Sequence, residues 1–433
     1  MNKPEDHLTS RRQFIKHSSS AVLAGAVSTP LIFASHARAV SPGDTIKVGL
    51  VGCGGRGSGA AAQALAADKN VQLTALGDAF EENLMNAHRS LEKQSGDKVK
   101  VEPDHRFVGL DAYQKVINSG VDVVILATPP GFRPIHLQAA IEAGKHVFCE
   151  KPMAVDAPGV RMVLAAAEEA KKKKLCLASG FCWRSHYPKR ETFQRLLEGG
   201  VGRINTIYST YNTGPVKDPA IRKEGWTDME TQVRNWYQFS WLSGDHIVEQ
   251  AVHSLNMMAW AMGDAPPVQC TANGGRQVRT SLGNIYDHFG VVYDYENGAR
   301  GFHMCRQISG CSNDYSVNFA GTEGSCVVDC NRDRHYITGK NEWNYRGPKN
   351  EMYQTEHDEL FAAIRDGKQI NHGVWMAHST LLAIMGRMAA YTGQTITWEQ
   401  ALNSQEVLMP AKVAWDAPVE FPPVPMPGRT KFI

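Results

Sequence analysis

A glycine-rich turn with the sequence GCGGRG follows a run of aliphatic residues and precedes an alanine-rich stretch. Gly52, Gly54 and Gly57 have the G-x-G-x-x-G spacing that lets backbone amides approach a pyrophosphate at the start of a helix. The next expected strand ends in Asp78, where a carboxylate can bond the hydroxyls of an adenosine ribose. A glycine turn alone is weak evidence, but strand, turn, helix, strand and acid together predict a dinucleotide-binding site.

The residues after Asp78 bear on which dinucleotide is bound. Ala79 and Phe80 follow it, and no arginine stands there to meet the 2′-phosphate of NADP. We therefore expect NAD, with NADP the less favoured cofactor.

A second candidate is the lysine of Glu150-Lys151-Pro152, which directly follows the apolar run 146–149. Ligands of open α/β sheets bind outside the carboxyl ends of the strands, so Lys151 is expected at the reacting end of the dinucleotide. An ammonium group there can donate to a substrate hydroxyl or carbonyl and transfer a proton. Solvation at the surface is the alternative for a lone lysine, but this position favours catalysis. We count both Glu150 and Lys151 among the cofactor contacts.

Glu249 and His253 are four positions apart in a stretch expected to be one helix, 245–261. That spacing places both side chains on one helical face, where both can reach one substrate. Histidine titrates near neutrality and suits proton transfer at a hydroxyl whose carbon loses hydride. A salt-bridged helical face is the alternative, and it weighs more for Glu249. We therefore rank Lys151 and His253 ahead of Glu249 as catalytic residues.

Metal ligation by the same stretch is not expected. Asp245, His246, Glu249 and His253 could offer ligands in principle, but their spacing differs from H-E-x-x-H and hydride transfer needs no metal. Asp245 instead suits the cap of the helix, and His246 is a further candidate for the cleft.

Aromatic and basic residues gather before this helix and after the last expected strand of the first domain. Aromatic faces beside arginines suit a carbohydrate, although core packing explains most tryptophans equally well. Trp183 and Arg184 are expected to line the cleft, with Arg184 as a cofactor contact. The aromatic–basic stretch comprises Trp226, Arg234, Trp236, Tyr237 and Trp241.

The order of the elements predicts how these residues are positioned. Short β-rich runs alternate with helical stretches over 40–182, which predicts an α/β domain with a doubly wound parallel (Rossmann) sheet. From 183 to 433 the segments are strand-like, with a hairpin turn at Asn297-Gly298. Two helical stretches stand out there, 245–261 and 356–365. We expect a C-terminal α+β domain with a large, mostly antiparallel sheet.

The N-terminal segment, 1–39, is predicted to be a processing signal. Arg11-Arg12, followed by Phe14 and a modest apolar run, is typical of a twin-arginine export signal, with cleavage expected after Ala39. The apolar run contains Pro30 and is shorter than the roughly 20 residues of a spanning helix. We therefore expect a periplasmic or otherwise exported protein that uses the twin-arginine machinery and has no stable membrane span.

The charge balance argues against a nucleic-acid partner. The 433 residues carry 46 basic and 44 acidic side chains, a formal net charge of +2. Neither nucleic acid nor an anionic membrane is favoured by such a balance.

The sequence resembles the Gfo/Idh/MocA family, named for glucose–fructose oxidoreductase and inositol dehydrogenase. The resemblance rests on VGCGGRGSGA, GDAF, VVILATPPGFRPIHLQAAIEAGKHVFCEKPMA and SGDHIVEQAVHSLNMMAWAMGD, and covers essentially the whole chain after the signal. It implies a Rossmann domain, and a C-terminal domain whose sheet is often used for homo-oligomerisation. It also implies catalysis by Lys151, with Thr128, Pro129 and His136 near the cofactor. Many members carry D-x-x-x-H where this chain has Glu249 and His253.

An exported enzyme has no obvious NAD pool, so the cofactor is expected to be bound tightly and regenerated on the enzyme. One way is to oxidise a sugar or glycoside and reduce a second carbonyl compound. The alternative is a glycoside hydrolase that oxidises transiently, eliminates and returns the hydride. The dehydrogenase is preferred because glycosidase relatives carry a tyrosine–histidine arrangement in the second motif. A third alternative is a sugar-binding protein without catalytic activity. The presence of both Lys151 and His253 argues against it.

Overall fold

The computed structural model describes residues 43–216 and 219–433. The predicted signal peptide, 1–39, lies outside the described residues. Within the described ranges, no helix is both long and apolar enough to cross a bilayer.

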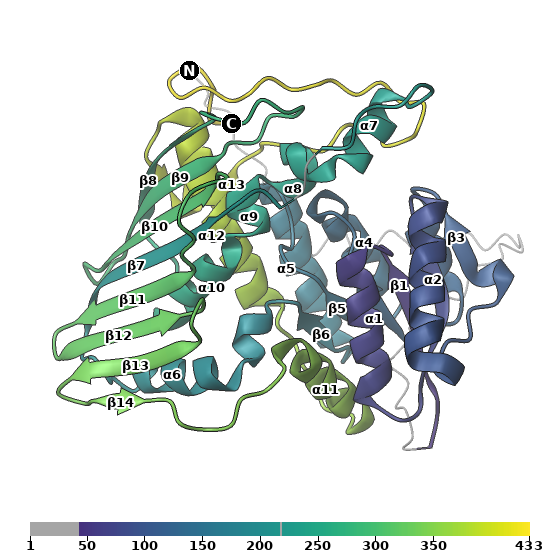
Figure 1. Cartoon of the computed structure of the whole chain (residues 1–433), viewed down its shortest axis with the longest axis horizontal. Helices are drawn as coiled ribbons and strands as arrows, with labels where there is room; N and C mark the ends of the chain where they lie inside the picture. Colours follow the sequence, from purple (N-terminus) through teal and green to yellow (C-terminus); the bar gives the residue numbers. More distant parts are fainter. Residues whose placement is uncertain (1–42, 217–218) are drawn as a thin grey trace, which may run out of the picture. The chain divides into compact units, whose positions relative to one another are not determined.

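A six-stranded parallel sheet forms the first part of the fold, as predicted (Figure 1). Its order is β3-β2-β1-β4-β5-β6, so the direction of winding reverses between β1 and β4. The β4 strand, Val123–Leu126, is buried along its whole length, as expected for a strand covered on both faces. The other strands are β1 (Ile46–Val51), β2 (Val71–Asp78), β3 (Arg106–Val108), β5 (His146–Cys149) and β6 (Leu177–Ser179).

Helices cover both faces of this sheet. One apolar cluster joins the sheet to α1 and α2, and a second joins its other face to α3, α4 and α5. Asp156 caps α5 by accepting from the amide of Gly159. The helices are α1 (Gly55–Ala67), α2 (Glu81–Ser95), α3 (Ala112–Asn118), α4 (Arg133–Glu142) and α5 (Ala157–Lys172).

A nine-stranded sheet forms the second part, in the order β14-β13-β12-β11-β7-β10-β9-β8-β15. Among the described strands of this second sheet, only β7 and β10 pair in parallel. The other neighbouring strands of the sheet pair antiparallel, as predicted. The strands are β7 (Ile204–Thr213), β8 (Gln269–Gly275), β9 (His288–Asp294), β10 (Arg300–Gln307), β11 (Ser316–Gly321), β12 (Gly324–Asp329), β13 (Arg334–Gly339), β14 (Trp343–Asn344) and β15 (Ile396–Thr397).

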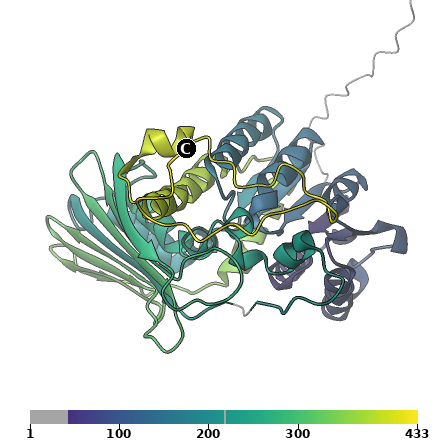
Figure 2. The ribbon, with the colours of Figure 1, turned by 90° about the horizontal axis from the view of Figure 1, so that it is seen from above.

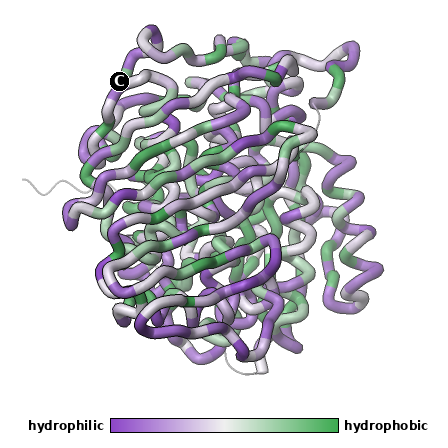
Figure 3. The backbone as a smooth tube through the Cα atoms, turned by 60° about the vertical axis from the view of Figure 1, so that its left-hand side comes forward, coloured by the Kyte–Doolittle hydropathy of each residue, from purple (hydrophilic) through white to green (hydrophobic). Residues whose placement is uncertain are grey.

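One face of the nine-stranded sheet packs on helices and the other does not. Buried and less buried residues alternate along β9 and β10, which places every second side chain in the core. Figure 3 looks onto this sheet and shows hydrophobic and hydrophilic residues mixed along its strands. Figure 1 shows α6 (Tyr187–Leu197), α10 (Val252–Ala261) and α12 (Gly373–Thr392) on the covered side.

The helices of the C-terminal half agree only in part with the sequence predictions. The expected helix 245–261 is interrupted: α9 (His246–Glu249) and α10 are separate. The predicted helix near Glu356 is confirmed as α11 (Met352–Arg365). It packs against α1, so a C-terminal segment completes one face of the first sheet. The helices α6, α7 (Asp228–Arg234), α8 (Ser240–Ser243), α12 and α13 (Trp398–Asn403) were not predicted.

The C-terminal segment after α13 crosses between the two parts of the fold (Figure 2). The ring of Trp415 lies 5.5 Å from that of Phe80, in the loop after β2. The chain then returns to the second sheet, where the carbonyl of Pro425 accepts from the hydroxyl of Tyr286 at 2.8 Å.

Candidate active site

A cleft of about 530 Å³ lies at the carboxyl ends of β1, β2, β4 and β5. Its walls include the glycine turn and the loops after β2, β4 and β5. Residues of the second part also line it, among them Glu249 and Arg234. This is the edge of a doubly wound sheet at which ligands bind.

The glycine turn has the geometry that a pyrophosphate needs. Gly52 has a φ of +96°, a conformation that side chains disfavour. A Cβ on Gly57 would lie 1.9 Å from the carbonyl oxygen of Gly52, so only glycine lets α1 approach β1 this closely. A Cβ on Gly54 would meet nothing within 4 Å, and no side chain caps the first amides of α1. The turn therefore fits a dinucleotide pyrophosphate at the start of α1.

Asp78 ends β2 at the wall of the cleft, as predicted. Its carboxylate accepts from the amide of Cys53 at 2.6 Å and from the amide of Phe80 at 2.9 Å. Burial raises the pKa of this carboxyl, while these amides and the side chain of Asn83 oppose the shift. The carboxylate thus fixes the glycine turn to the loop after β2, beside the place of the adenosine ribose.

Thr128, Pro129 and His136 all line the cleft, as the family resemblance implied. The hydroxyl of Thr128 lies 3.3 Å from Nδ1 of His136, whose ring stacks on Tyr113 at 4.0 Å. Burial, with a smaller effect of Arg133, lowers the pKa of His136 to about 3. This histidine is therefore neutral at ordinary pH.

Lys151 and Glu249 meet at the end of the cleft opposite Asp78. Nζ of Lys151 donates to Oε1 of Glu249 at 2.9 Å and to its carbonyl oxygen at 2.5 Å. Each of the two side chains is 14% exposed, which leaves the pair open to the cleft but largely out of bulk water. Glu249, ranked below His253 from the sequence, is thus the direct partner of Lys151.

The interruption between α9 and α10 has a local cause. In an unbroken helix the carbonyl of Glu249 would accept from the amide of His253. That carbonyl instead accepts from Lys151, and the His253 amide donates to the carbonyl of Gln250 at 3.4 Å. The predicted single helix 245–261 is therefore wrong at the point where the chain contributes to the site.

His253 does not line the cleft, although it is close to Lys151. Its ring packs against Trp183 at 5.0 Å and Phe181 at 6.1 Å. Nδ1 is buried and has no hydrogen-bond partner among the described residues. Burial, then the positive charges of Lys151 and Lys189, hold the pKa of His253 well below its usual value. The imidazole is therefore neutral at ordinary pH.

Glu150 lines the cleft and anchors the glycine turn. Its carboxylate accepts from Nε of Arg56 at 2.5 Å, and the Arg56 guanidinium lies over the ring of Tyr353 at 4.8 Å. Burial lowers the pKa of Arg56, but Glu150, with a smaller contribution from Glu356, acts in the opposite direction and the pKa is raised overall. Sequence analysis missed Arg56, although it occupies a variable position of the glycine motif itself.

Arg184 lies outside the cleft, so the structure does not bring it to the predicted cofactor contact. Its guanidinium pairs with both carboxylate oxygens of Asp264 and lies 4.1 Å from the ring of Trp375. Its neighbour Trp183 contacts His253 instead of lining the cleft. His246, the other cleft candidate, is 1% exposed and bonds Asp245, which caps α9 as predicted.

The aromatic–basic stretch is divided between the cleft and the core. Trp226, Arg234 and Trp236 line the cleft, and Arg234 lies over Phe80, next but one after Asp78. These three residues were expected to suit a carbohydrate; the structure places Arg234 beside Phe80 and Glu82, close to Asp78. Trp241 is buried in an apolar cluster.

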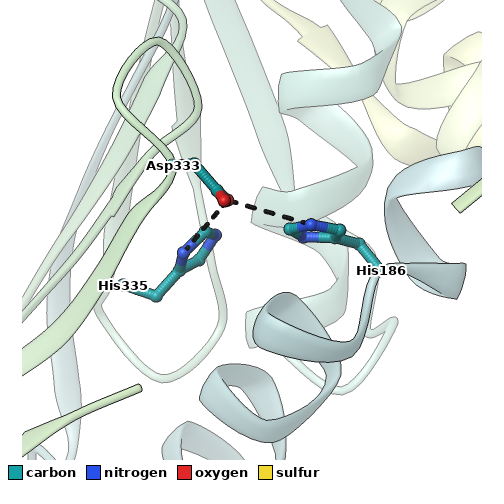
Figure 4. Close-up of side chains that lie close together, drawn as sticks. All are labelled: His186, Asp333 and His335. Carbon is teal, nitrogen blue, oxygen red and sulfur yellow. Dashed lines mark ion pairs between the residues drawn. The ribbon is translucent and has the colours of Figure 1, made fainter. Parts of the chain in front are cut away.

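One group of side chains within residues 43–216 and 219–433 has the composition of a metal site, and it lies outside the cleft (Figure 4). Oδ1 of Asp333 is 3.8 Å from Nε2 of His186 and 3.7 Å from Nδ1 of His335. Lys349 pairs with the other oxygen of Asp333, and Nζ of Lys189 lies 3.2 Å from Nδ1 of His186. A lysine donating to Nδ1 leaves the proton of His186 on Nε2, facing the carboxylate. One ammonium group on the carboxylate and a second on His186 favour a polar network over a bound cation.

Comparison with known proteins gives a consistent result. A family model described as "Oxidoreductase family, NAD-binding Rossmann fold" matches residues 46–181, and the companion model of its C-terminal alpha/beta domain matches residues 194–407. Inositol 2-dehydrogenase of Rhizobium meliloti (strain 1021) is 22% identical over 322 residues, which is 73% of this chain and 86% of that protein.

Solved structures share the fold. Levoglucosan dehydrogenase, in complex with NADH and levoglucosan, has a TM-score of 0.64 at 21% identity. The match covers 82% of this chain and 99% of the dehydrogenase chain. Aldose–aldose oxidoreductase from Caulobacter crescentus, complexed with glycerol, has a TM-score of 0.65 at 20% identity with the same coverage. The predicted fold class and the expected NAD-binding domain are confirmed, as is an NAD(P)-dependent dehydrogenase at the level of the family.

Proposed function

Because the chain belongs to the Gfo/Idh/MocA family of oxidoreductases, we propose that it is an NAD-dependent dehydrogenase of sugars or glycosides, acting on a hydroxyl-bearing carbon. The names of its relatives, among them inositol, levoglucosan and aldose oxidoreductases, support a polyol or sugar substrate. The single observation that carries the proposal is the Lys151–Glu249 pair, which faces the cleft at the end opposite Asp78.

The residues of the cleft fit the cofactor from end to end. The amides at the start of α1 would hold the pyrophosphate, and Asp78 the ribose hydroxyls. A negative charge at Asp78 disfavours a 2′-phosphate, which supports NAD over NADP. When bound, NAD supplies the acceptor for the hydride that leaves the hydroxyl-bearing carbon.

We assign proton transfer to Lys151 and His253. Lys151 has three N–H donors, and Glu249 accepts two of them, so the third is available to a substrate oxygen. As the carbon loses hydride, its hydroxyl proton must pass to a base; Lys151 would take it up while passing one of its own protons to the neutral His253, which lies close to Lys151 behind the cleft. Glu249 balances the charge of Lys151 and fixes the direction of its donors.

Export and assembly are part of the proposal. The twin-arginine pattern supports export of the folded chain, after which the cofactor would stay bound and be regenerated by a second carbonyl substrate. A homo-oligomer through the uncovered face of the nine-stranded sheet is supported by Tyr208 and Met304, which are exposed on the adjacent strands β7 and β10.

The test is to purify the protein without its signal, supply NAD, and follow the absorbance of reduced nicotinamide while sugars, polyols and glycosides are added. We expect reduction that a second carbonyl compound reverses. Release of free aglycone without net reduction would instead favour the hydrolase that oxidises only transiently. Neither reduction nor release with any of these compounds would contradict both.

A further inference from the structure

Three residues of the second domain, Trp226, Arg234 and Trp236, line the cleft on the side of Phe80, and we call them the clasp. All three line the cleft together with Phe80 and Asn83 of the first domain. Nothing in the dehydrogenase chemistry requires them, because the reacting end lies at Lys151. Their position at the other end calls for a separate role.

Arg234 ties the clasp to the first domain. Its guanidinium lies 3.9 Å from the centre of the Phe80 ring, and NH1 lies 2.5 Å from Oε1 of Glu82 at the start of α2. A second carboxylate, Glu230, holds Nε at 2.8 Å, and Trp226 lies 4.7 Å from the same guanidinium. These carboxylates raise the pKa of Arg234 against the effect of burial. The arginine is therefore a charged bridge between α7 and α2.

Apolar packing behind the clasp supports this bridge. Phe80, Trp236 and Trp415 belong to one cluster, whose buried centre contains Met229 and Phe239. The cluster joins the loop after β2, the segment around α7 and the C-terminal segment. The Arg234–Glu82 pair alone is part-exposed and contributes little, so the cover depends on the pair and the aromatic contacts together.

We propose that the clasp retains the adenosine half of the dinucleotide, so that the cofactor stays bound from one turnover to the next. The proposal rests on the proposed function for the identity of the ligand. Adenine is a flat aromatic ring, and the indole rings of the clasp are suited to stack on it, while Arg234 holds the clasp against Phe80. A dinucleotide held in this way leaves only when the clasp separates from Phe80 and Glu82.

The test measures cofactor release without any substrate. Holoenzyme is loaded with radiolabelled NAD, unlabelled NAD is added in excess, and loss of label from the protein is followed with time. Arg234→Ala is expected to release NAD at least about tenfold faster than the wild type, because it removes both the ion pair and the stacking on Phe80. Trp226→Ala is expected to accelerate release in the same direction.

Arg195→Ala is the matched control. Arg195 also pairs with a glutamate, Glu191, and lies 4.7 Å from an aromatic ring, Trp343, but it is outside the cleft. Its release rate should equal that of the wild type. Glu82→Gln removes the ion pair and leaves the aromatic packing in place. It should accelerate NAD release less than Arg234→Ala does. If Arg234→Ala fails to fold, the release rate of Glu82→Gln tests the proposal.

Unchanged release in Arg234→Ala and Glu82→Gln would overturn the clasp. Equal acceleration in Arg195→Ala would do so too, since the effect would then be a general loss of stability. Failure of the proposed function is distinguishable, because it would appear as absent nicotinamide reduction with every sugar while release still depended on Arg234.

Discussion

The two ends of the cleft are each closed by an ion pair between the two domains, and the pairs differ in exposure. At the reacting end, Lys151 and Glu249 are each 14% exposed. At the adenosine end, Arg234 is 22% and Glu82 is 55% exposed. A largely buried pair leaves a costly uncompensated charge when one partner is removed, whereas a part-exposed pair contributes little alone. We therefore assign chemistry to the first pair and retention to the second.

Of the four variants, Lys151→Met should lower turnover the most. The variant loses the ammonium that contacts the substrate oxygen, and we expect turnover to fall by about 10²- to 10⁴-fold. Steady-state rates with the best substrate measure the fall in turnover. NAD should be retained as in the wild type, which the label-release assay checks. Turnover within a few-fold of the wild type would remove Lys151 from the mechanism.

Glu249→Gln should produce a smaller loss at the same end. The main-chain carbonyl still accepts from Lys151, but the carboxylate that balances its charge is gone. A charge-assisted hydrogen bond contributes about 1.5–3 kcal/mol, so turnover should fall by about 10- to 100-fold. A loss as large as that of Lys151→Met, measured side by side, would mean that Glu249 itself exchanges the proton.

Asp78→Asn probes the adenosine end without touching the chemistry. An amide keeps one acceptor for the amides of Cys53 and Phe80 but loses the negative charge. The preference for NAD over NADP should fall by about tenfold, measured as the ratio of dissociation constants, while turnover per bound cofactor stays within a few-fold. An unchanged ratio would show that another group excludes the 2′-phosphate.

His136 belongs to neither ion pair, and its buried, neutral imidazole predicts an effect on the pH dependence of stability. Its pKa is about 3 in the folded chain and near 6.5 in an unfolded one. Below pH 6.5 the unfolded chain therefore binds more protons, and stability falls as pH falls from about 6.5 toward 3. His136→Gln should flatten the slope of the unfolding free energy, measured by denaturant titration, by at most about 1.4 kcal/mol per pH unit. An unchanged slope would mean that His136 is not held neutral.

Sequence reasoning located the first domain well because its signals are local. Gly52, Gly54, Gly57 and Asp78 lie in one strand–turn–helix–strand unit, where spacing alone sets the geometry. The reacting end was predicted less completely. Lys151 and Glu249 lie 98 positions apart, and the helix break that frees the Glu249 carbonyl depends on Lys151 being there.

The remaining departures have similar causes. Most of α12 is buried around its whole circumference, so it lacks the apolar stripe by which surface helices are recognised. Trp226 and Arg234 were expected to suit a carbohydrate, but the place of Arg234 in the cleft depends on Phe80 and Glu82, which lie in the other domain. Arg184 was predicted to contact the cofactor because it follows β6. Its side chain lies outside the cleft instead, where it contacts Asp264 and Trp375.

The most direct test follows the hydride from the hydroxyl-bearing carbon of the substrate to the cofactor. The enzyme with bound NAD is mixed with a sugar or polyol deuterated at its hydroxyl-bearing carbons, and the released cofactor is examined by mass spectrometry. We predict one deuterium per reduced cofactor in the wild type, and in Lys151→Met the same deuterated cofactor formed about 10²- to 10⁴-fold more slowly. Substrate turnover by the wild type with no deuterium in the cofactor would contradict hydride transfer in this cleft.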